Sequence, residues 1–251
     1  MTGVDLGAQL AAPALVAAAR LLAQRTRLTI ALAPIVGSGR AADSAGGRCA
    51  ANEALGACGF LQALDGHHHH DGRPMWPAAC TGSIAHAGTI AAAAVVALPR
   101  RAAPSCCGVG IDIEIEGSLP AVDAMTVLGP DERALVDGAI HPDAFATMLW
   151  SAKEAAYKAW CEAVDGHIGA VDPVDIRVEI GAPVDGLHPV VARACGALGA
   201  TLADLCPAVG WCVAADGYVL TAVCVGPVPR HGDDGIASEA ITSPSPANAT
   251  T

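Results

Sequence analysis

The chain has 251 residues, of which 53% are hydrophobic but only 3% aromatic, so a sizeable core must be built from aliphatic side chains. Its net charge of −11 argues against sequence-independent binding of nucleic acid, which needs a basic surface. The ten cysteines contain no C-x-x-C pair, which argues against a zinc ribbon or disulfide framework and favours reduced thiols in the cytoplasm. The apolar stretches predict neither an export signal nor a membrane span.

The first 60 residues predict a helix, a strand and a second helix. An Ala-rich helix is expected over 6–24, a strand over 28–36 and a helix over 49–58. Two arginines beside glycines, Arg40 and Arg48, lie on the approach to the second helix. They could hold an anion between guanidinium groups and backbone amides, although ordinary surface arginines are the alternative.

The next segment predicts an exposed loop and a hairpin. Four histidines between Asp-Gly pairs, in DGHHHHDG at 65–72, are expected to form a loop without a function. Two prolines then stiffen the approach to a pair of apolar runs around an Ala-Gly turn, which indicates a hairpin ending near residue 98. Ser83 and His86 lie beside that turn, where they could contact a phosphate or simply be satisfied polar residues.

An acidic strand is predicted at 108–116, GVGIDIEIE. Its apolar residues alternate with Gly110, Asp112, Glu114 and Glu116, which is the period-2 pattern of a strand with one apolar face. Successive carboxylates on one face lie about 7 Å apart and repel each other. A hard divalent cation shared between them would relieve that repulsion.

A helix is predicted at 150–160, WSAKEAAYKAW, with Ser151 as its N-terminal cap. The only two lysines of the chain, Lys153 and Lys158, lie here, while the other twelve strong bases are arginines. This bias indicates that both positions require a compact ammonium rather than a planar guanidinium. Glu154 and Lys158 are four residues apart and share a helix face, although a solvent-facing ion pair is the alternative explanation.

The remaining patterns suggest two halves. The polar, proline-bearing segment 99–105 is the best internal boundary, and a further helix is expected around 131–136. Two β-rich runs around Asp216-Gly217 predict a hairpin over 210–225, the counterpart of the hairpin ending near residue 98. From residue 227 onward the composition is typical of a disordered tail. We therefore predict an N-terminal half over 1–104, a C-terminal half over 105–229 and a disordered tail over 230–251.

Four motifs in order resemble the Sfp-type 4′-phosphopantetheinyl transferases, especially the subgroup that includes the enterobactin-synthase transferases. They are WP-x(4)-GSI-x-H at 76–86, GIDIE at 110–114, W-S-x-KE-x-x-x-K at 150–158 and GxW…DGYVLTAV at 210–223. The resemblance implies an α+β fold of two similar halves with the active site in the cleft between them. It also implies Mg²⁺-dependent transfer of 4′-phosphopantetheine from coenzyme A to a serine of an acyl or peptidyl carrier protein, releasing adenosine 3′,5′-bisphosphate. The modified carriers are implied to serve polyketide or nonribosomal peptide synthesis.

The resemblance assigns roles to ten residues. Asp112, Glu114 and Glu154 are implied to hold Mg²⁺, with Mn²⁺ as an alternative ion, and Glu154 to act as general base. Lys158 is implied to neutralise or protonate the leaving phosphate, with Lys153 contacting phosphate nearby. The residues implied to bind coenzyme A, in addition to those two lysines, are Arg40, Arg48, Arg73, Ser83 and His86. A monomer is expected, because both halves belong to one chain.

The chain also departs from the family pattern. Trp150 stands where the family usually has Phe, Ala51 stands where another arginine is common, and the segment after the lysine helix, 161–176, has no aromatic residue. Two other functions remain open on the residues alone. One is a metal-dependent phosphohydrolase acting on coenzyme A or a nucleotide, and the other is a catalytically weakened coenzyme A-binding protein of the same fold.

Overall fold

The computed structural model describes residues 12–64, 66–98, 107–164, 166 and 168–226, which form an α+β fold with two antiparallel sheets. The first sheet has the strand order β1-β3-β2, with β1 at Thr29–Pro34, β2 at Cys80–Ala87 and β3 at Ile90–Ala97. The second has the order β4-β8-β7-β6-β5, with β4 at Gly108–Ile115, β5 at Ile176–Ile180, β6 at His188–Ala194, β7 at Ala208–Ala215 and β8 at Tyr218–Val225. The predicted α+β class is confirmed.

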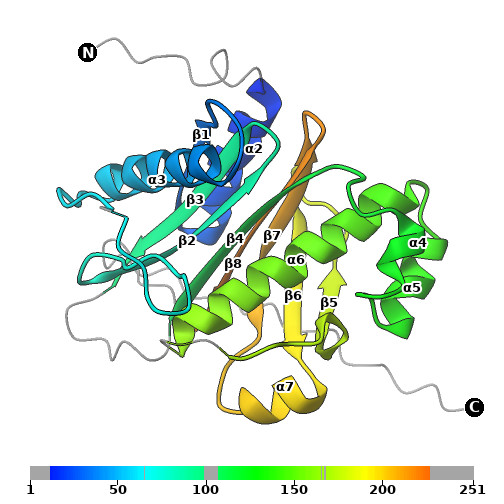
Figure 1. Ribbon diagram of the computed structural model, residues 1–251. Helices are drawn as coiled ribbons and strands as arrows, with labels where there is room; N and C mark the ends of the chain where they lie inside the picture. The colour runs from blue at the N-terminus through cyan, green and yellow to red at the C-terminus, as the bar shows by residue number, and fades with distance from the viewer. Residues whose placement is uncertain (1–11, 65, 99–106, 165, 167, 227–251) are drawn as a thin grey trace, which may run out of the picture.

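Six α-helices and one 3-10 helix are present among the described residues. They are α2 at Pro13–Thr26, α3 at Arg40–Ala57, α4 at Ala121–Ala124, α5 at Pro130–Asp137, α6 at Pro142–Ala163, α7 at Gly196–Thr201 and the 3-10 helix η2 at Pro173–Asp175. Helix α3 covers the first sheet and the long α6 crosses the second, with α4 and α5 at one end of α6 (Figure 1). None of the described helices is long and apolar enough to cross a bilayer.

The core is divided by the first sheet into two layers. Along β3, Ala91, Ala93 and Val95 pack with α3, because alternate residues of a strand point to opposite faces. The other β3 face packs with α2 and with the apolar residues of β4, such as Ile111 and Ile113. Helix α2 and the inner faces of both sheets therefore share one core, which ties the two parts of the chain together.

Two glycines of β4 allow α6 to lie directly on the strand. A Cβ atom at Gly108 would lie 1.8 Å from the Ala159 carbonyl oxygen, and one at Gly110 equally close to that of Ala155. Contacts this short are impossible for any side chain, so only glycine permits this backbone approach. The residues of β4 that face α6 after these glycines are thus held at short range from the helix.

Both predicted hairpins are confirmed. Strands β2 and β3 pair around Gly88-Thr89, and β7 and β8 pair around Asp216-Gly217. Asp216 and Gly217 have φ values of 51° and 75°, as a tight two-residue hairpin turn requires.

Two helix predictions need correction. Helix α6 begins at Pro142, which suits the first helical position, so Ser151 lies in mid-helix. Its buried hydroxyl donates to Thr221 Oγ1 and caps nothing. Helix α3 begins at Arg40, so Arg40 and Arg48 lie on the helix and not on its approach.

The proposed limits of the two halves are not tested. The boundary near residue 104 and the tail over 230–251 lie outside the described residues. The first predicted helix appears as α2, and the part of that prediction before residue 12 also lies outside them.

Candidate active site

The acidic face of β4 meets helix α6 through a charged pair. Lys158 Nζ lies 2.6 Å from Asp112 Oδ1 and donates a longer hydrogen bond of 3.4 Å to the Ile111 carbonyl oxygen. Asp112 is 4% exposed, so its carboxylate is largely shielded from water, whereas the Lys158 side chain is 27% exposed. The acidic strand and helix α6 therefore meet through Lys158, while a cation shared with Glu154 remains a prediction.

Burial and opposite charge act against each other in this pair. Burial raises the pKa of Asp112, and the neighbouring Lys158 ammonium partly reverses that effect. Burial disfavours the charge on Lys158, but Asp112, Glu154 and Glu114 outweigh it and raise its pKa. The Lys158 ammonium therefore stays protonated, and three carboxylates favour its positive charge.

Glu114 and Glu154 complete the acidic group. Burial raises the pKa of both carboxyl groups, and Asp112 raises them further by repulsion, whereas Lys158 lowers them. Glu114 Oε1 also accepts a hydrogen bond of 3.2 Å from the Trp150 indole nitrogen, which favours its ionised form. One carboxylate thus comes from α6 and two from β4, and the charge of Asp112 acts on both of the others.

The donor set fits a hard divalent cation by its chemistry. Asp112 Oδ2 is buried and has no hydrogen-bond partner, which costs free energy unless a bound group such as a cation contacts this oxygen. Carboxylate oxygens of this kind are the ligands that Mg²⁺ prefers. As their side chains stand, no three His, Cys, Asp or Glu residues in the described ranges are close enough together to hold an ion.

The position of Lys153 does not support the expected phosphate contact. Its side chain is 1% exposed, and its ammonium lies 2.8 Å from Glu132 Oε2 in α5. Burial lowers the pKa of Lys153, and Glu132 opposes that shift. The two lysines therefore point to different partners, Lys158 to the acidic strand and Lys153 to α5 and β5.

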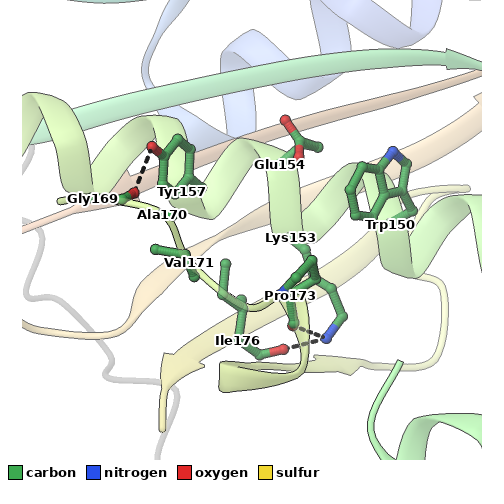
Figure 2. Close-up of a pocket in the computed structure, with 9 residues that line it drawn as sticks. All are labelled: Trp150, Lys153, Glu154, Tyr157, Gly169, Ala170, Val171, Pro173 and Ile176. Carbon is green, nitrogen blue, oxygen red and sulfur yellow. Dashed lines mark hydrogen bonds between the residues drawn. The ribbon is translucent and has the colours of Figure 1, made fainter. Parts of the chain in front are cut away.

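A pocket of about 340 Å³ lies on the α6 face that carries Glu154. The helix contributes Trp150, Lys153, Glu154 and Tyr157, and the opposite wall contributes Gly169, Ala170, Val171, Pro173 and Ile176. Figure 2 shows Lys153 extending to the wall, where its Nζ donates to the carbonyl oxygens of Pro173 and Ile176. The Tyr157 hydroxyl donates to the Gly169 carbonyl oxygen at 3.4 Å. Burial raises the pKa of Tyr157 to about 12, so this hydroxyl remains a donor.

Ser83 and His86 lie on opposite faces of β2. Ser83 is buried on the face that packs toward the second part of the chain, together with Ala85. His86 is exposed on the other face, which carries Ile84 against α3. Residues three apart on a strand point to opposite faces of the sheet, so the structure does not bring the two side chains together.

The three predicted coenzyme-binding arginines have different surroundings. Arg40 is exposed at the start of α3, and Arg48 donates to Ser44 Oγ at 2.5 Å within the same helix. Arg73 pairs with Asp71 at 2.8 Å and with Glu162 of α6 at 3.1 Å. The Arg73 side chain lowers the pKa of Asp71 to about 2. Arg73 thus joins the histidine-bearing loop to the end of α6.

Two polar residues near the site, Glu132 and Glu162, were missed in the sequence. Glu132 is 3% exposed and accepts from the Gly129 amide at 2.7 Å, as expected for a Glu three residues after a helix start. That spacing in GPDER is a local signal that could have found Glu132. Glu162 accepts from Thr81 and Arg73, but no local pattern marks a contact between residues so far apart in the chain.

Comparisons with known proteins identify the family of the chain. The family model described as the 4′-phosphopantetheinyl transferase N-terminal domain matches residues 30–96, and the 4′-phosphopantetheinyl transferase superfamily model matches residues 108–181. Together the two matches span more than half of the chain, and the second includes both β4 and α6. The chain belongs to the 4′-phosphopantetheinyl transferase superfamily.

Individual relatives match only part of the chain. It is 38% identical over 92 residues to the 4′-phosphopantetheinyl transferase Npt of Nocardia iowensis, a match covering 36% of this chain and 38% of that relative. Among solved structures, Thermotoga maritima holo-[acyl-carrier-protein] synthase (AcpS) matches with 19% identity and a TM-score of 0.34. That match covers 47% of this chain and 62% of the other.

Proposed function

We propose that this protein transfers 4′-phosphopantetheine from coenzyme A to the acceptor serine of an acyl or peptidyl carrier protein. The observation that carries the proposal is the 2.6 Å pair between Lys158 Nζ and Asp112 Oδ1. This pair joins the acidic motif at 110–114 to the helix motif at 150–158. Both motifs lie within the region matched by the superfamily model. The relative from Nocardia iowensis, named as such a transferase, supports the same activity.

The reaction needs a base, a charged leaving-group partner and screening of the diphosphate. The serine oxygen forms a bond to the β-phosphorus of coenzyme A, and the bond from that phosphorus to the bridging oxygen breaks. Adenosine 3′,5′-bisphosphate leaves with the bridging oxygen. Glu154 takes the serine proton, since burial raises the pKa of this carboxyl group towards that of a useful base. The positive charge of Lys158 offsets the charge on the departing phosphate.

Asp112, Glu114 and Glu154 are the proposed ligands of Mg²⁺, for which Mn²⁺ could substitute. When bound, the cation screens the negative charge of the diphosphate and of the leaving phosphate. The buried, unpartnered Asp112 Oδ2 supports this assignment. Trp150 holds Glu114 by a hydrogen bond and thereby orients one of the three ligands.

We assign the coenzyme phosphates to Arg40, Arg48, Arg73 and His86, and leave out Ser83, which is buried on the opposite face of β2 from His86. Arg40 and Arg48 lie on one helix with accessible surface, which supports a role in holding an anion. Arg73 would have to share its guanidinium with Asp71 and Glu162, or release one of them, to bind phosphate. The pathway of the carrier, a monomeric state, the cytoplasmic location and the cleft between two halves remain predictions from the sequence.

The test is to incubate the purified protein with coenzyme A, Mg²⁺ and several apo carrier proteins, and to weigh the carriers by mass spectrometry. The proposal predicts that at least one carrier gains one phosphopantetheine group and that a chelator prevents the gain. Hydrolysis of coenzyme A without a carrier would instead identify a phosphohydrolase. Binding of coenzyme A with no modification of any carrier would identify a protein that has lost turnover.

A further inference from the structure

Lys153 makes as many polar contacts as its ammonium has protons. Its Nζ atom lies 2.8 Å from Glu132 Oε2 and 2.9 Å from the Pro173 carbonyl oxygen, and it also donates to the carbonyl oxygen of Ile176. An ammonium has three N–H donors and no acceptor, so three acceptors satisfy it completely. The side chain is 1% exposed, and these three acceptors replace the hydrogen bonds that water would otherwise provide.

Glu132 connects the same point to two further elements. Its Oε2 atom accepts from the Gly129 amide at the start of α5, and its Oε1 atom accepts at 2.8 Å from the Val178 amide in β5. The Lys153–Glu132 pair therefore fastens α5 and β5 to the middle of α6. A buried pair of this kind is costly to break, because each charge would remain without its partner.

The segment held by this pair is the wall of the pocket beside Glu154. The pocket wall, residues 169–176, is tied to α6 at one end by Tyr157 through Gly169 and at the other by Lys153 through Pro173 and Ile176 (Figure 2). Lys153 and Tyr157 are four residues apart and so lie on one helix face. Glu154 directly follows Lys153 in α6 and lines the same pocket, so the two ties of α6 to the wall also set the distance from the wall to Glu154.

We infer that Lys153 is a positioning residue: its ammonium fixes the pocket wall at a set distance from Glu154, and thereby sets the affinity of the site for its donor substrate. This inference rests on the proposed function for its kinetic part only. It accounts for the presence of lysine in a chain that otherwise uses arginine. A planar guanidinium has five N–H donors in a fixed fork, which three acceptors around one nitrogen cannot match.

Three variants of the pair test this role. We expect Lys153→Met and Lys153→Arg to raise the KM for coenzyme A about tenfold while kcat changes less than about threefold, because the transition-state residues stay in place. Lys153→Met should also lower the thermal midpoint, since Glu132 would be left buried without a counter-charge. The double variant Lys153→Met/Glu132→Gln should regain much of that midpoint, because its pair is neutral. Its KM should remain high, because the carbonyl oxygens of the wall still lack their donor.

The chain supplies a matched control. Arg177 and Asp131 form an ion pair of 3.2 Å between the same two elements, β5 and α5, but it is exposed. We expect Arg177→Met to leave KM, kcat and the thermal midpoint unchanged, because exposed pairs contribute little. Loss of affinity in both Lys153→Met and Arg177→Met would mean that any disturbance of β5 has this effect, and would overturn the specific role of Lys153.

Hydrogen exchange makes the test independent of turnover. Amide exchange measured by mass spectrometry should become faster in peptides covering 169–178 of Lys153→Met and Lys153→Arg, while peptides of β1 and β3 stay unchanged. If the wild-type protein modifies no carrier, the proposed function fails, yet the exchange result still decides whether Lys153 holds the wall. Wild-type exchange in both single variants would overturn the inference. So would a double variant that recovers KM together with stability, because Lys153 would then act only through the stability of the fold.

Discussion

Gly110 of β4 lies directly beneath the carbonyl oxygen of Ala155 in α6, so closely that a Cβ atom there would lie 1.8 Å from that oxygen. The same strand carries Asp112 two residues later, and the same helix carries Lys158 three residues later. The approach of the two backbones therefore brings the acidic strand within reach of the lysine. We expect this contact to determine both stability and activity.

The first prediction concerns this contact. Gly110→Ala should push α6 away from β4, lower the free energy of unfolding by roughly 1–3 kcal/mol and reduce carrier modification strongly. Denaturant unfolding and the rate of carrier modification measure the two effects. Gly56→Ala is the control, because no atom lies within 4 Å of the added Cβ in α3. It should keep full activity and gain up to about 1 kcal/mol of stability. An unimpaired Gly110→Ala variant would mean that the close approach is not needed.

The second prediction concerns the carboxylates. Asp112→Asn and Glu154→Gln should each reduce the rate of carrier modification by roughly 10²–10⁴-fold, because one removes a metal ligand and the other the base. Circular dichroism should show an intact fold in both. Glu116→Gln, which changes the exposed carboxylate just after β4, should retain wild-type activity. Full activity in either of the first two variants would contradict the site assignment.

The third prediction concerns the Trp150 hydrogen bond. Trp150→Phe keeps an aromatic ring but removes the N–H that holds Glu114. The Mg²⁺ concentration for half-maximal rate should rise roughly 10-fold or more, in line with the loss of a group that orients a metal ligand. Trp160→Phe is a fitting comparison, because it removes an indole hydrogen bond to the Cys206 carbonyl oxygen, away from the carboxylates. It should leave the Mg²⁺ requirement unchanged, and an equal rise in both variants would refute the role of Trp150.

The fourth prediction concerns pH. Burial raises the pKa of Asp112, Glu114 and Glu154, so protons occupy these groups at a higher pH than usual. Because a metal ion binds the ionised form, its apparent affinity must fall as pH falls. The increase in thermal midpoint produced by Mg²⁺ should therefore be large at about pH 8 and small at about pH 6. An equal increase at both values, or an unaltered increase in Asp112→Asn, would argue against these ligands.

The sequence was sufficient for features encoded locally. The alternation in β4 and the Asp216-Gly217 turn follow from backbone geometry over a few residues, and both are present. The restriction of lysine to two positions also indicated that an ammonium is needed there. What each ammonium contacts could not be read from the helix alone, since both lysines lie on α6 but meet different elements.

The features that the sequence missed depend on packing. Helix α6 extends back to Pro142 because the residues before Trp150 pack as well as those after it, and Ser151 has no terminus to cap. The Arg73–Glu162 pair joins residues 89 positions apart, which no local pattern can reveal. Ser83 and His86 were predicted to act together because both lie beside the turn, although a strand places residues three apart on opposite faces.

The proposed transfer is tested most directly by measuring the release of adenosine 3′,5′-bisphosphate from coenzyme A with and without an apo carrier protein. We predict one nucleotide released for each carrier serine modified, no release without a carrier, and none from Asp112→Asn. Release without a carrier, or carriers that stay unmodified while coenzyme A is consumed, would contradict a transferase and assign the acidic site to hydrolysis.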